Sequence, residues 1–273
     1  MLNCNFGQRW AGAALGVILL GGTAGGAWAD PVGLMPLPRD VRVTGASRED
    51  EGLRIQAPFA VRFDGYQDAR LQAATIRFQG DVSRLAGLSE TSAGAVGPAL
   101  IIVTRPDSKA NQLGAVEAYR LTVGADGVRL TADGPDGVLR GLATLRQLLE
   151  RRGENAVLPY VEIDDAPRFA WRGLMIDTAR HFMTLETLKR QVDAMERVKL
   201  NVLHLHFSDN EGFRIESLRY PRLTTVASHG QYYTQDQVRD LVAYAAARGV
   251  RVVPEIDLPA HTGAIMTAYP ELA

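Results

Sequence analysis

The sequence of 273 residues is almost without cysteine, since Cys4 is the only one. It also lacks a long run of like charge, and its formal net charge at pH 7 is -1. This balance gives no electrostatic reason to expect nucleic acid or an anionic membrane surface as a partner. Hydrophobic residues make up 46% and charged residues 22% of the chain, as in ordinary globular proteins. The length allows one large domain or two ordinary ones.

A long hydrophobic span is missing too, but the N-terminus has a shorter apolar stretch. Arg9 precedes the glycine-rich run AGAALGVILLGGTAGGA, and Ala27 and Ala29 are small residues at the two positions that a signal peptidase reads. The run is too short and too rich in glycine to favour the alternative, a membrane anchor. We therefore predict a signal peptide over residues 1–29 and an exported protein, periplasmic or extracellular. Cys4 would leave with the signal, so the remaining chain would need no oxidant to fold.

Residues 30–165 have the pattern of a small α+β domain. QAPFAVRFDG and PALIIVTRPD are short apolar runs that end in turn residues. YRLTVGADGVRLTADG alternates like two strands, joined by a hairpin turn between Gly124 and Gly127. DGVLRGLATLRQLLERRG has apolar residues at helical spacing and predicts a helix that ends at Gly153.

Residues 166–273 have a different rhythm, in which strands and helices alternate. Strands are predicted in WRGLMIDTARHF, NVLHLHFSD and VRVVPEIDLPAH. Helices are predicted between them, beginning at the capping residues Thr184 and Thr234. Such βαβ units form parallel sheets. The predicted fold class is therefore α/β, with the first three βα units of a (β/α)₈ TIM barrel. The barrel is incomplete, because a full one typically needs about 250 residues.

Polar residues follow each of the three predicted parallel strands. A parallel sheet is buried on both faces, so polar residues at its carboxyl edge need an explanation. In a TIM barrel the active site lies at this edge and is built from several strand ends. The sequence therefore predicts a site here, with candidates in three groups: Asp177, Arg180 and His181; His204, His206 and Asp209; Glu255, Asp257 and His261.

Two readings of these polar residues remain open from their types alone. Each of them could have a structural, hydrogen-bonded role. Alternatively, His204 and His206 with an aspartate and a further histidine could bind zinc in a metal-dependent hydrolase. A chelator would inhibit such an enzyme and would leave a metal-free one active.

Three ordered motifs carry a resemblance to a known family. RGLMIDTARHF, LNVLHLHFSDNEGFRIES and RVVPEIDLPAHTGA together resemble glycoside hydrolase family 20, the β-N-acetylhexosaminidases. The region before them resembles the small N-terminal domain of that family. The resemblance implies hydrolysis of terminal non-reducing N-acetylglucosamine or N-acetylgalactosamine with retention of configuration. The acetamido oxygen of the substrate would be the nucleophile, an exception to the two-carboxylate scheme.

The resemblance also implies roles for individual residues. Arg180 would bind hydroxyls of the terminal sugar, and Asp257 would shape the pocket near Arg180. Asp209 and His261 would form a polar relay toward a glutamic acid that protonates the leaving oxygen, while His204 and His206 would support the strand end. No metal and no cofactor is implied. The expected partner is an oligosaccharide or glycoconjugate that contains N-acetylhexosamine.

One expected part of the family's site is missing. The catalytic Asp-Glu pair is expected on the next barrel strand, beyond Ala273, so these residues alone are expected to be inactive. A non-catalytic carbohydrate-binding remnant is the alternative. Asn210 and Glu211 also depart from the family's usual Asp then Gln, which could alter the local charge.

Overall fold

The computed structural model describes residues 33–45, 52–88, 97–153 and 155–272. Pro31–Ala273 forms one compact unit. The predicted signal peptide lies outside the described residues. No helix in the described part of the chain combines the length and the apolar character needed to cross a membrane.

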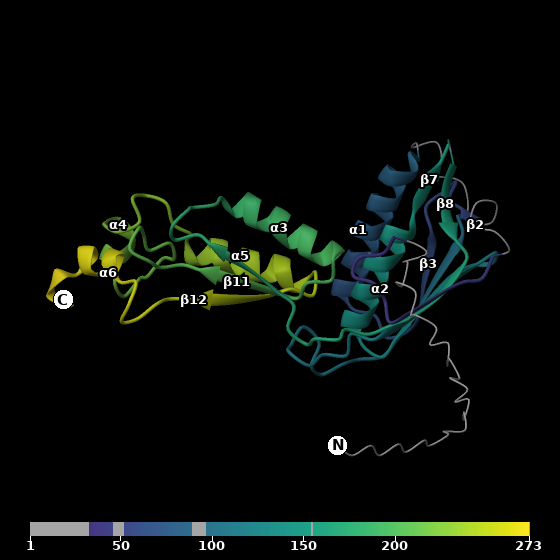
Figure 1. The fold of residues 1–273 in the computed structure, drawn as a ribbon, viewed down its shortest axis with the longest axis horizontal. Helices are drawn as coiled ribbons and strands as arrows, with labels where there is room; N and C mark the ends of the chain where they lie inside the picture. Colours follow the sequence, from purple (N-terminus) through teal and green to yellow (C-terminus); the bar gives the residue numbers. More distant parts are fainter. Residues whose placement is uncertain (1–32, 46–51, 89–96, 154, 273) are drawn as a thin grey trace, which may run out of the picture. The chain divides into compact units, whose positions relative to one another are not determined.

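The first half of the compact unit is built around a six-stranded mixed sheet (Figure 1). Its strand order is β1-β9-β5-β6-β4-β3, in which β3, β4 and β6 are parallel neighbours and β5, β9 and β1 pair antiparallel. The strands are β1 (Asp40–Val43), β3 (Ala60–Gly65), β4 (Ala99–Thr104), β5 (Tyr119–Gly124), β6 (Gly127–Ala132) and β9 (Val161–Asp165). The pairing of β5 with β6 confirms the predicted hairpin.

Two helices, α1 (Ala69–Ala86) and α2 (Pro135–Leu148), pack against each other and close the core of this half. Burial alternates along β4, β5 and β6, as expected of strands with one face against helices. The core residues Leu100, Leu121, Leu130 and Leu145 are fully buried. This half is therefore a sheet covered by a helical layer, the α+β arrangement that the sequence predicts.

The end of α2 differs from the sequence prediction. The helix ends at Leu148, and the following residues form the hairpin β7 (Glu150–Arg152) and β8 (Asn155–Pro159) instead of a last helical turn. Gly153, expected as the helix C-terminus, lies in the hairpin turn with φ +61°. A third strand, β2 (Gly52–Arg54), pairs with β8. The strand pairing outweighs the helical spacing of the last residues.

The second half has a three-stranded parallel sheet of order β10-β11-β12. Its elements are β10 (Gly173–Asp177), α3 (Leu185–Arg197), β11 (Val202–His206), α4 (Arg222–Thr225), α5 (Gln235–Ala246), β12 (Arg251–Glu255), α6 (Gly263–Ala268) and the 3₁₀ turn η2 (Pro270–Leu272). Thr184 caps α3 and Thr234 forms a capping box at α5, which confirms both predicted helix starts. The alternation of strand and helix is the expected start of a TIM barrel.

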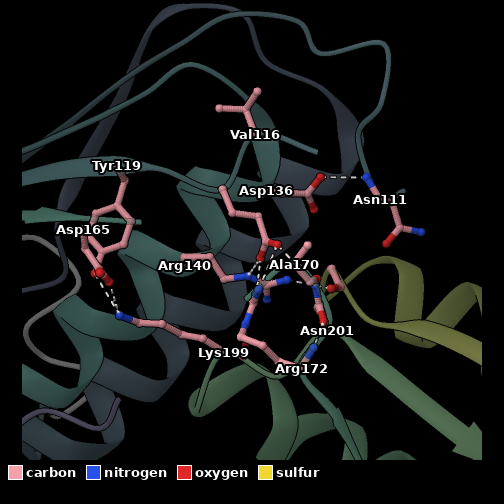
Figure 2. A network of polar contacts seen from close by, with 12 residues as sticks. Asn111, Val116, Tyr119, Asp136, Arg140, Asp165, Ala170, Arg172, Lys199 and Asn201 are labelled. Carbon is pink, nitrogen blue, oxygen red and sulfur yellow. Dashed lines mark hydrogen bonds and ion pairs between the residues drawn. The ribbon is translucent and has the colours of Figure 1, made fainter. Parts of the chain in front are cut away.

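A buried polar cluster joins the two halves where the parallel strands begin (Figure 2). We call Glu117, Arg140, Arg172 and Asn201 the strand-start cluster. Arg140 Nε donates to the Glu117 carboxylate at 2.6 Å, Arg172 donates to both of its oxygens, and Asn201 Nδ2 donates to it at 3.2 Å. Burial would raise the pKa of Glu117, but the two guanidiniums outweigh burial and hold that pKa below its ordinary value.

The strand-start cluster touches the beginning of each parallel strand. Arg172 directly precedes β10, and its amide donates to the side chain of Asn201, which directly precedes β11. The amide of Arg251, the first residue of β12, donates to the Asn201 carbonyl at 2.9 Å. Arg140, on α2, donates to the carbonyl of Gly249 at 2.8 Å. The first half of the chain therefore fixes the amino ends of the three strands.

A second buried group lies beside this cluster (Figure 2). Lys199 Nζ donates to Asp165 at 2.8 Å and to the Tyr119 hydroxyl at 2.9 Å. Burial lowers the pKa of Lys199, and the charge of Asp165 opposes that shift without cancelling it. Lys199 thereby adds a further contact between the turn before β11 and the strands β5 and β9, through Tyr119 and Asp165.

Candidate active site

The carboxyl ends of the three parallel strands bring the candidate residues together. Asp177, His206 and Glu255 are the last residues of β10, β11 and β12, and they are neighbours in the sheet register. The loops that follow contribute Arg180, Asp209 and His261. We call these six residues the strand-end cluster. The predicted gathering of side chains from the three strands at one edge is therefore seen in the structure.

Asp209 is the centre of the strand-end cluster. Its side chain is 1% exposed, and its carboxylate lies 2.5 Å from Arg180, 3.0 Å from His206 Nε2 and 3.2 Å from His261 Nδ1. The Asn210 amide donates to it at 2.7 Å. Burial alone would raise the pKa of Asp209, but these four donors outweigh burial and hold that pKa below its usual range. Asp209 is therefore an anion that fixes three cationic or polar side chains.

Arg180 forms the open side of the cluster. Its guanidinium donates to Asp177 at 2.6 Å and contacts Asp209, yet the side chain is 47% exposed. The charge of Glu211 lies 3.9 Å from its Nε. The carboxylates of Asp177 and Asp209 thus hold the Arg180 guanidinium in place while part of it still faces solvent. Its remaining donors suit the paired oxygens of a sugar.

His206 and Glu255 form the inner side of the cluster, and His204 contacts Glu255 from outside it. The Glu255 carboxylate lies 2.5 Å from His204 Nε2 and 3.1 Å from His206 Nδ1. Burial would lower the pKa of His206, but its contact with Asp209 and the charge of Glu255 outweigh burial and raise that pKa. Burial would likewise raise the pKa of Glu255, but its contacts with Asp257 and His206 lower it. The carboxylates of Asp209 and Glu255, on either side of His206, therefore favour the protonated form of its imidazole.

Asp257 lies beside His206 and Glu255 in the structure. Its amide donates to the Ser208 hydroxyl at 3.1 Å, and its carboxylate lies near His206 and Glu255. Among the described residues, no hydrogen bond or ion pair joins Asp257 to Arg180. A role of Asp257 in shaping the pocket near Arg180 stays a prediction, as do the roles of Arg180, Asp209 and His261.

The zinc alternative was expected at His204 and His206 with a further histidine, but the group of potential ligands among the described residues holds only His206 of these, with Glu255 and Asp257. One ligand atom each of His206, Glu255 and Asp257 lies within 4.8 Å of the others, and nitrogen with carboxylate oxygens is a donor set that zinc accepts. A metal needs the neutral imidazole, however, while the neighbouring carboxylates favour the charged form of His206. The same residues can therefore form an ion-paired polar cluster, which the chelator test distinguishes from a metal centre.

One supporting residue was not singled out from the sequence. Arg214 is 4% exposed and donates to the carbonyls of Ala179 and Ser228, at 2.9 and 2.6 Å. It thereby fixes the loop that carries Arg180 to the segment after β11. Its position within the motif FRIES is a sequence signal, but only the fold shows that the guanidinium points inward to backbone carbonyls.

Family models match most of the chain. The model described as "Glycosyl hydrolase family 20, domain 2" matches residues 32–166, and "Glycosyl hydrolase family 20, catalytic domain" matches residues 169–273. The beta-hexosaminidase of Akkermansia muciniphila is 47% identical over 167 residues, 57% of this chain and 34% of that protein. The beta-N-acetylhexosaminidase of Cellulomonas fimi is 42% identical over 164 residues, 57% of this chain and 33% of that protein. The matched residues thus span about a third of these relatives.

Solved structures of the same family resemble the fold. The chitobiase of Flavobacterium johnsoniae gives a TM-score of 0.79 at 37% identity, over 87% of this chain and 36% of that chain. The N-acetyl-beta-hexosaminidase of Streptomyces plicatus gives 0.73 at 31% identity, over 88% of this chain and 48% of that chain. These neighbours confirm the predicted fold class, with an N-terminal layer followed by part of a TIM barrel. With both family models and these structures in agreement, the chain belongs to glycosyl hydrolase family 20.

Proposed function

We propose that the protein removes terminal, non-reducing N-acetylglucosamine or N-acetylgalactosamine from oligosaccharides or glycoconjugates. The observation that carries the proposal is the Asp209 carboxylate, held by Arg180, His206 and His261 at the carboxyl edge of the parallel sheet. The relatives support it, because those from Akkermansia muciniphila and Cellulomonas fimi are named beta-hexosaminidase and beta-N-acetylhexosaminidase. A solved structure of an exo beta-N-acetylglucosaminidase from Vibrio harveyi is a complex with N-acetylglucosamine.

In this proposal Arg180 binds hydroxyls of the terminal sugar. Asp177 and Asp209 fix its guanidinium, so little side-chain freedom is lost when a sugar binds. Asp209 and His261 act as a relay that orients and electrostatically tunes the proton donor. Asp257 and Glu255 line the inner wall.

The reaction proceeds with the substrate's own acetamido group as nucleophile. Its carbonyl oxygen attacks the anomeric carbon and displaces the leaving oxygen, which takes a proton from a glutamic acid. Water then attacks the anomeric carbon, the bond to the acetamido oxygen breaks, and the water proton returns to the glutamate. Asp209 and Glu255 do not fit the role of that acid, because both have a lowered pKa and are ionised at neutral pH.

The experiment is a hydrolysis assay, with two matched substrates, of the intact protein, by which we mean a form that includes the Asp-Glu pair expected beyond Ala273. Nitrophenyl β-N-acetylglucosaminide is expected to release nitrophenol, whereas nitrophenyl β-glucoside, which lacks the acetamido group, is not. Equal turnover of both would contradict the substrate-assisted mechanism. Residues 33–272 alone are expected to release none, since this mechanism assigns the proton donor to none of them.

Two further outcomes separate the alternatives. Binding of N-acetylglucosamine by the intact protein without any turnover would favour the non-catalytic carbohydrate-binding reading. Loss of activity on dialysis against a chelator, restored by zinc, would favour a metal-dependent hydrolase at His206, Glu255 and Asp257. Under the proposal, a chelator leaves the activity unchanged.

We also propose that the protein is exported. The apolar N-terminal run and the small residues Ala27 and Ala29 support this. Mass spectrometry of the protein purified from its own cells is expected to find Asp30 as the first residue. A cytoplasmic protein that retains Met1 would refute the export.

A further inference from the structure

A crevice separate from the strand-end cluster lies among helices of both halves. It has a volume of about 280 Å³. Residues of the helices α1, α2 and α3 and of the turn between α5 and β12 bound it. Buried apolar side chains, Phe78, Leu139 and Leu142, contribute its floor. Charged side chains contribute the rest of the wall: Arg77, Arg146, Arg197, Arg248, Asp81, Asp193 and Glu196.

The acidic residues of the crevice are already paired. Asp81 lies 2.7 Å from Arg146 Nε and also contacts Arg84. Glu196 lies 2.9 Å from Arg77 and 3.6 Å from Arg248. Asp193 lies 2.6 Å from Arg248 and accepts a hydrogen bond from Tyr244. The acidic wall therefore has little capacity left to balance a further cation.

Arg197, an exposed residue at the edge of the crevice, is that further cation. Its guanidinium makes no hydrogen bond or ion pair with any part of the chain that the structure describes, while its charge, after burial, is a cause that lowers the pKa of Arg146. In addition, Arg77 Nε is buried and donates to no described acceptor. Four guanidiniums against three carboxylates leave the wall positive, with an unused buried N–H donor.

We propose that this crevice binds a small organic anion, with one carboxylate and a short apolar body. Guanidinium groups are the best side-chain partners for a carboxylate, and the apolar floor suits a short aliphatic body. A volume of about 280 Å³ lies just below the usual range of small-molecule pockets, as suits a small ligand. Such a ligand touches α1 and α2 of the first half and α3 of the second, so it also stabilises their contact by mass action.

The test compares three six-carbon probes by isothermal titration into the intact protein. Hexanoate carries the carboxylate, 1-hexanol is its neutral match and hexylamine its cationic match. Hexanoate is expected to bind at least about tenfold more tightly than 1-hexanol, because a hydrogen bond to a charged group contributes more than one between neutral groups. Hexylamine is expected not to bind.

Two variants and two controls place the binding in the crevice. Arg197→Gln is expected to weaken hexanoate binding about tenfold. Gly80→Leu is expected to block it, since a Cβ at this wall position of α1 meets no atom within 4 Å and a longer side chain can extend into the space. Arg190→Gln, on the same helix as Arg197 but outside the wall, and Gly80→Ala, with one methyl group, are expected to retain binding.

Circular dichroism checks that each variant is folded before its titration is interpreted. Unchanged hexanoate binding in folded Arg197→Gln overturns the assignment of the anion to this crevice. Equal affinity for hexanoate and 1-hexanol overturns the anionic character of the ligand. Absence of hexanoate binding to the unsubstituted protein overturns the proposal as a whole. None of these outcomes bears on the hydrolysis proposed at the strand-end cluster.

Discussion

The same three parallel strands carry a closed polar cluster at one end and an open one at the other. In the strand-start cluster, Glu117, Arg140 and Asn201 are at most 8% exposed. In the strand-end cluster, Asp209 is buried just as deeply, but the side chains of Arg180 and His261 are 47% and 49% exposed. TIM barrels place stabilising residues at the first end and chemistry at the second. The centre of each cluster is buried, so the two clusters differ in the exposure of the side chains around that centre.

The largest expected effect on stability follows from removing Glu117, the centre of the strand-start cluster. Glu117→Ala leaves Arg140 and Arg172 without their shared carboxylate in a buried place. We expect the free energy of unfolding to fall by about 3–5 kcal/mol, because an uncompensated buried charge remains. Urea denaturation of the intact protein measures it.

The matched control is another glutamate in an ion pair at the surface. Glu162 lies 3.7 Å from Arg42, and both side chains are more than half exposed. Glu162→Ala is expected to change the free energy of unfolding by at most about 1 kcal/mol. Equal losses in the two variants would show that the closed cluster does not hold the two halves together.

A second prediction concerns how the free energy of unfolding depends on pH through Glu117 of the strand-start cluster. Glu117 has a folded-state pKa below its ordinary value of 4.5, so its stabilisation is complete above that pH and is lost as the pH falls through the folded-state pKa. Below pH 4.5 the free energy of unfolding should therefore fall more steeply in the unsubstituted protein than in Glu117→Gln, which has no titrating group there. Denaturation curves at a series of pH values measure the two slopes, and parallel slopes contradict the prediction.

A third prediction concerns the strand-end cluster. Asp209→Asn removes the carboxylate whose hydrogen bond with His206 helps to raise the pKa of that imidazole. We expect the pKa of His206 to fall in the variant, as followed by NMR titration of the imidazole. Asp240→Asn, at an exposed carboxylate paired with Lys189, is the control and should leave the pKa of His206 unchanged. A His206 pKa that is the same in Asp209→Asn would remove Asp209 from the centre of the site.

The smallest expected effect is that of Arg180→Ala on stability. The side chain is half exposed, and the buried Asp209 carboxylate keeps His206, His261 and the Asn210 amide as partners when Arg180 is removed. We expect the midpoint of thermal unfolding to stay within about 2 °C of that of the unsubstituted protein. Differential scanning calorimetry measures it. A large drop would mean that Arg180 holds the fold and would weaken its assignment to the site.

Much of the second half could be predicted from the sequence, because its signals are local. Capping residues such as Thr184 and Thr234 mark helix starts, and apolar runs that end in polar residues mark parallel strands. The gathering of Arg180, Asp209 and His261 followed from the rule that parallel strands end at one edge. These inferences needed no knowledge of which segments meet across the chain.

The strand-start cluster could not be predicted from such local signals. Glu117 lies in an irregular segment before β5, and its partners are 23, 55 and 84 residues further along the chain. Nothing in the local pattern distinguishes it from an exposed glutamate. The same holds for the end of α2, where the pairing of β7 with β8 decides the structure and the helical spacing does not.

The most direct test of the division between the two clusters is the affinity of the intact protein for N-acetylglucosamine, measured by isothermal titration. Arg180→Ala is expected to weaken binding by about tenfold to a hundredfold, because it removes charged hydrogen bonds to the sugar. Arg190→Ala, at an exposed arginine of α3, is expected to bind as tightly as the unsubstituted protein. Unchanged affinity in folded Arg180→Ala would contradict the account, since the open end of the strands would then not be where the sugar binds.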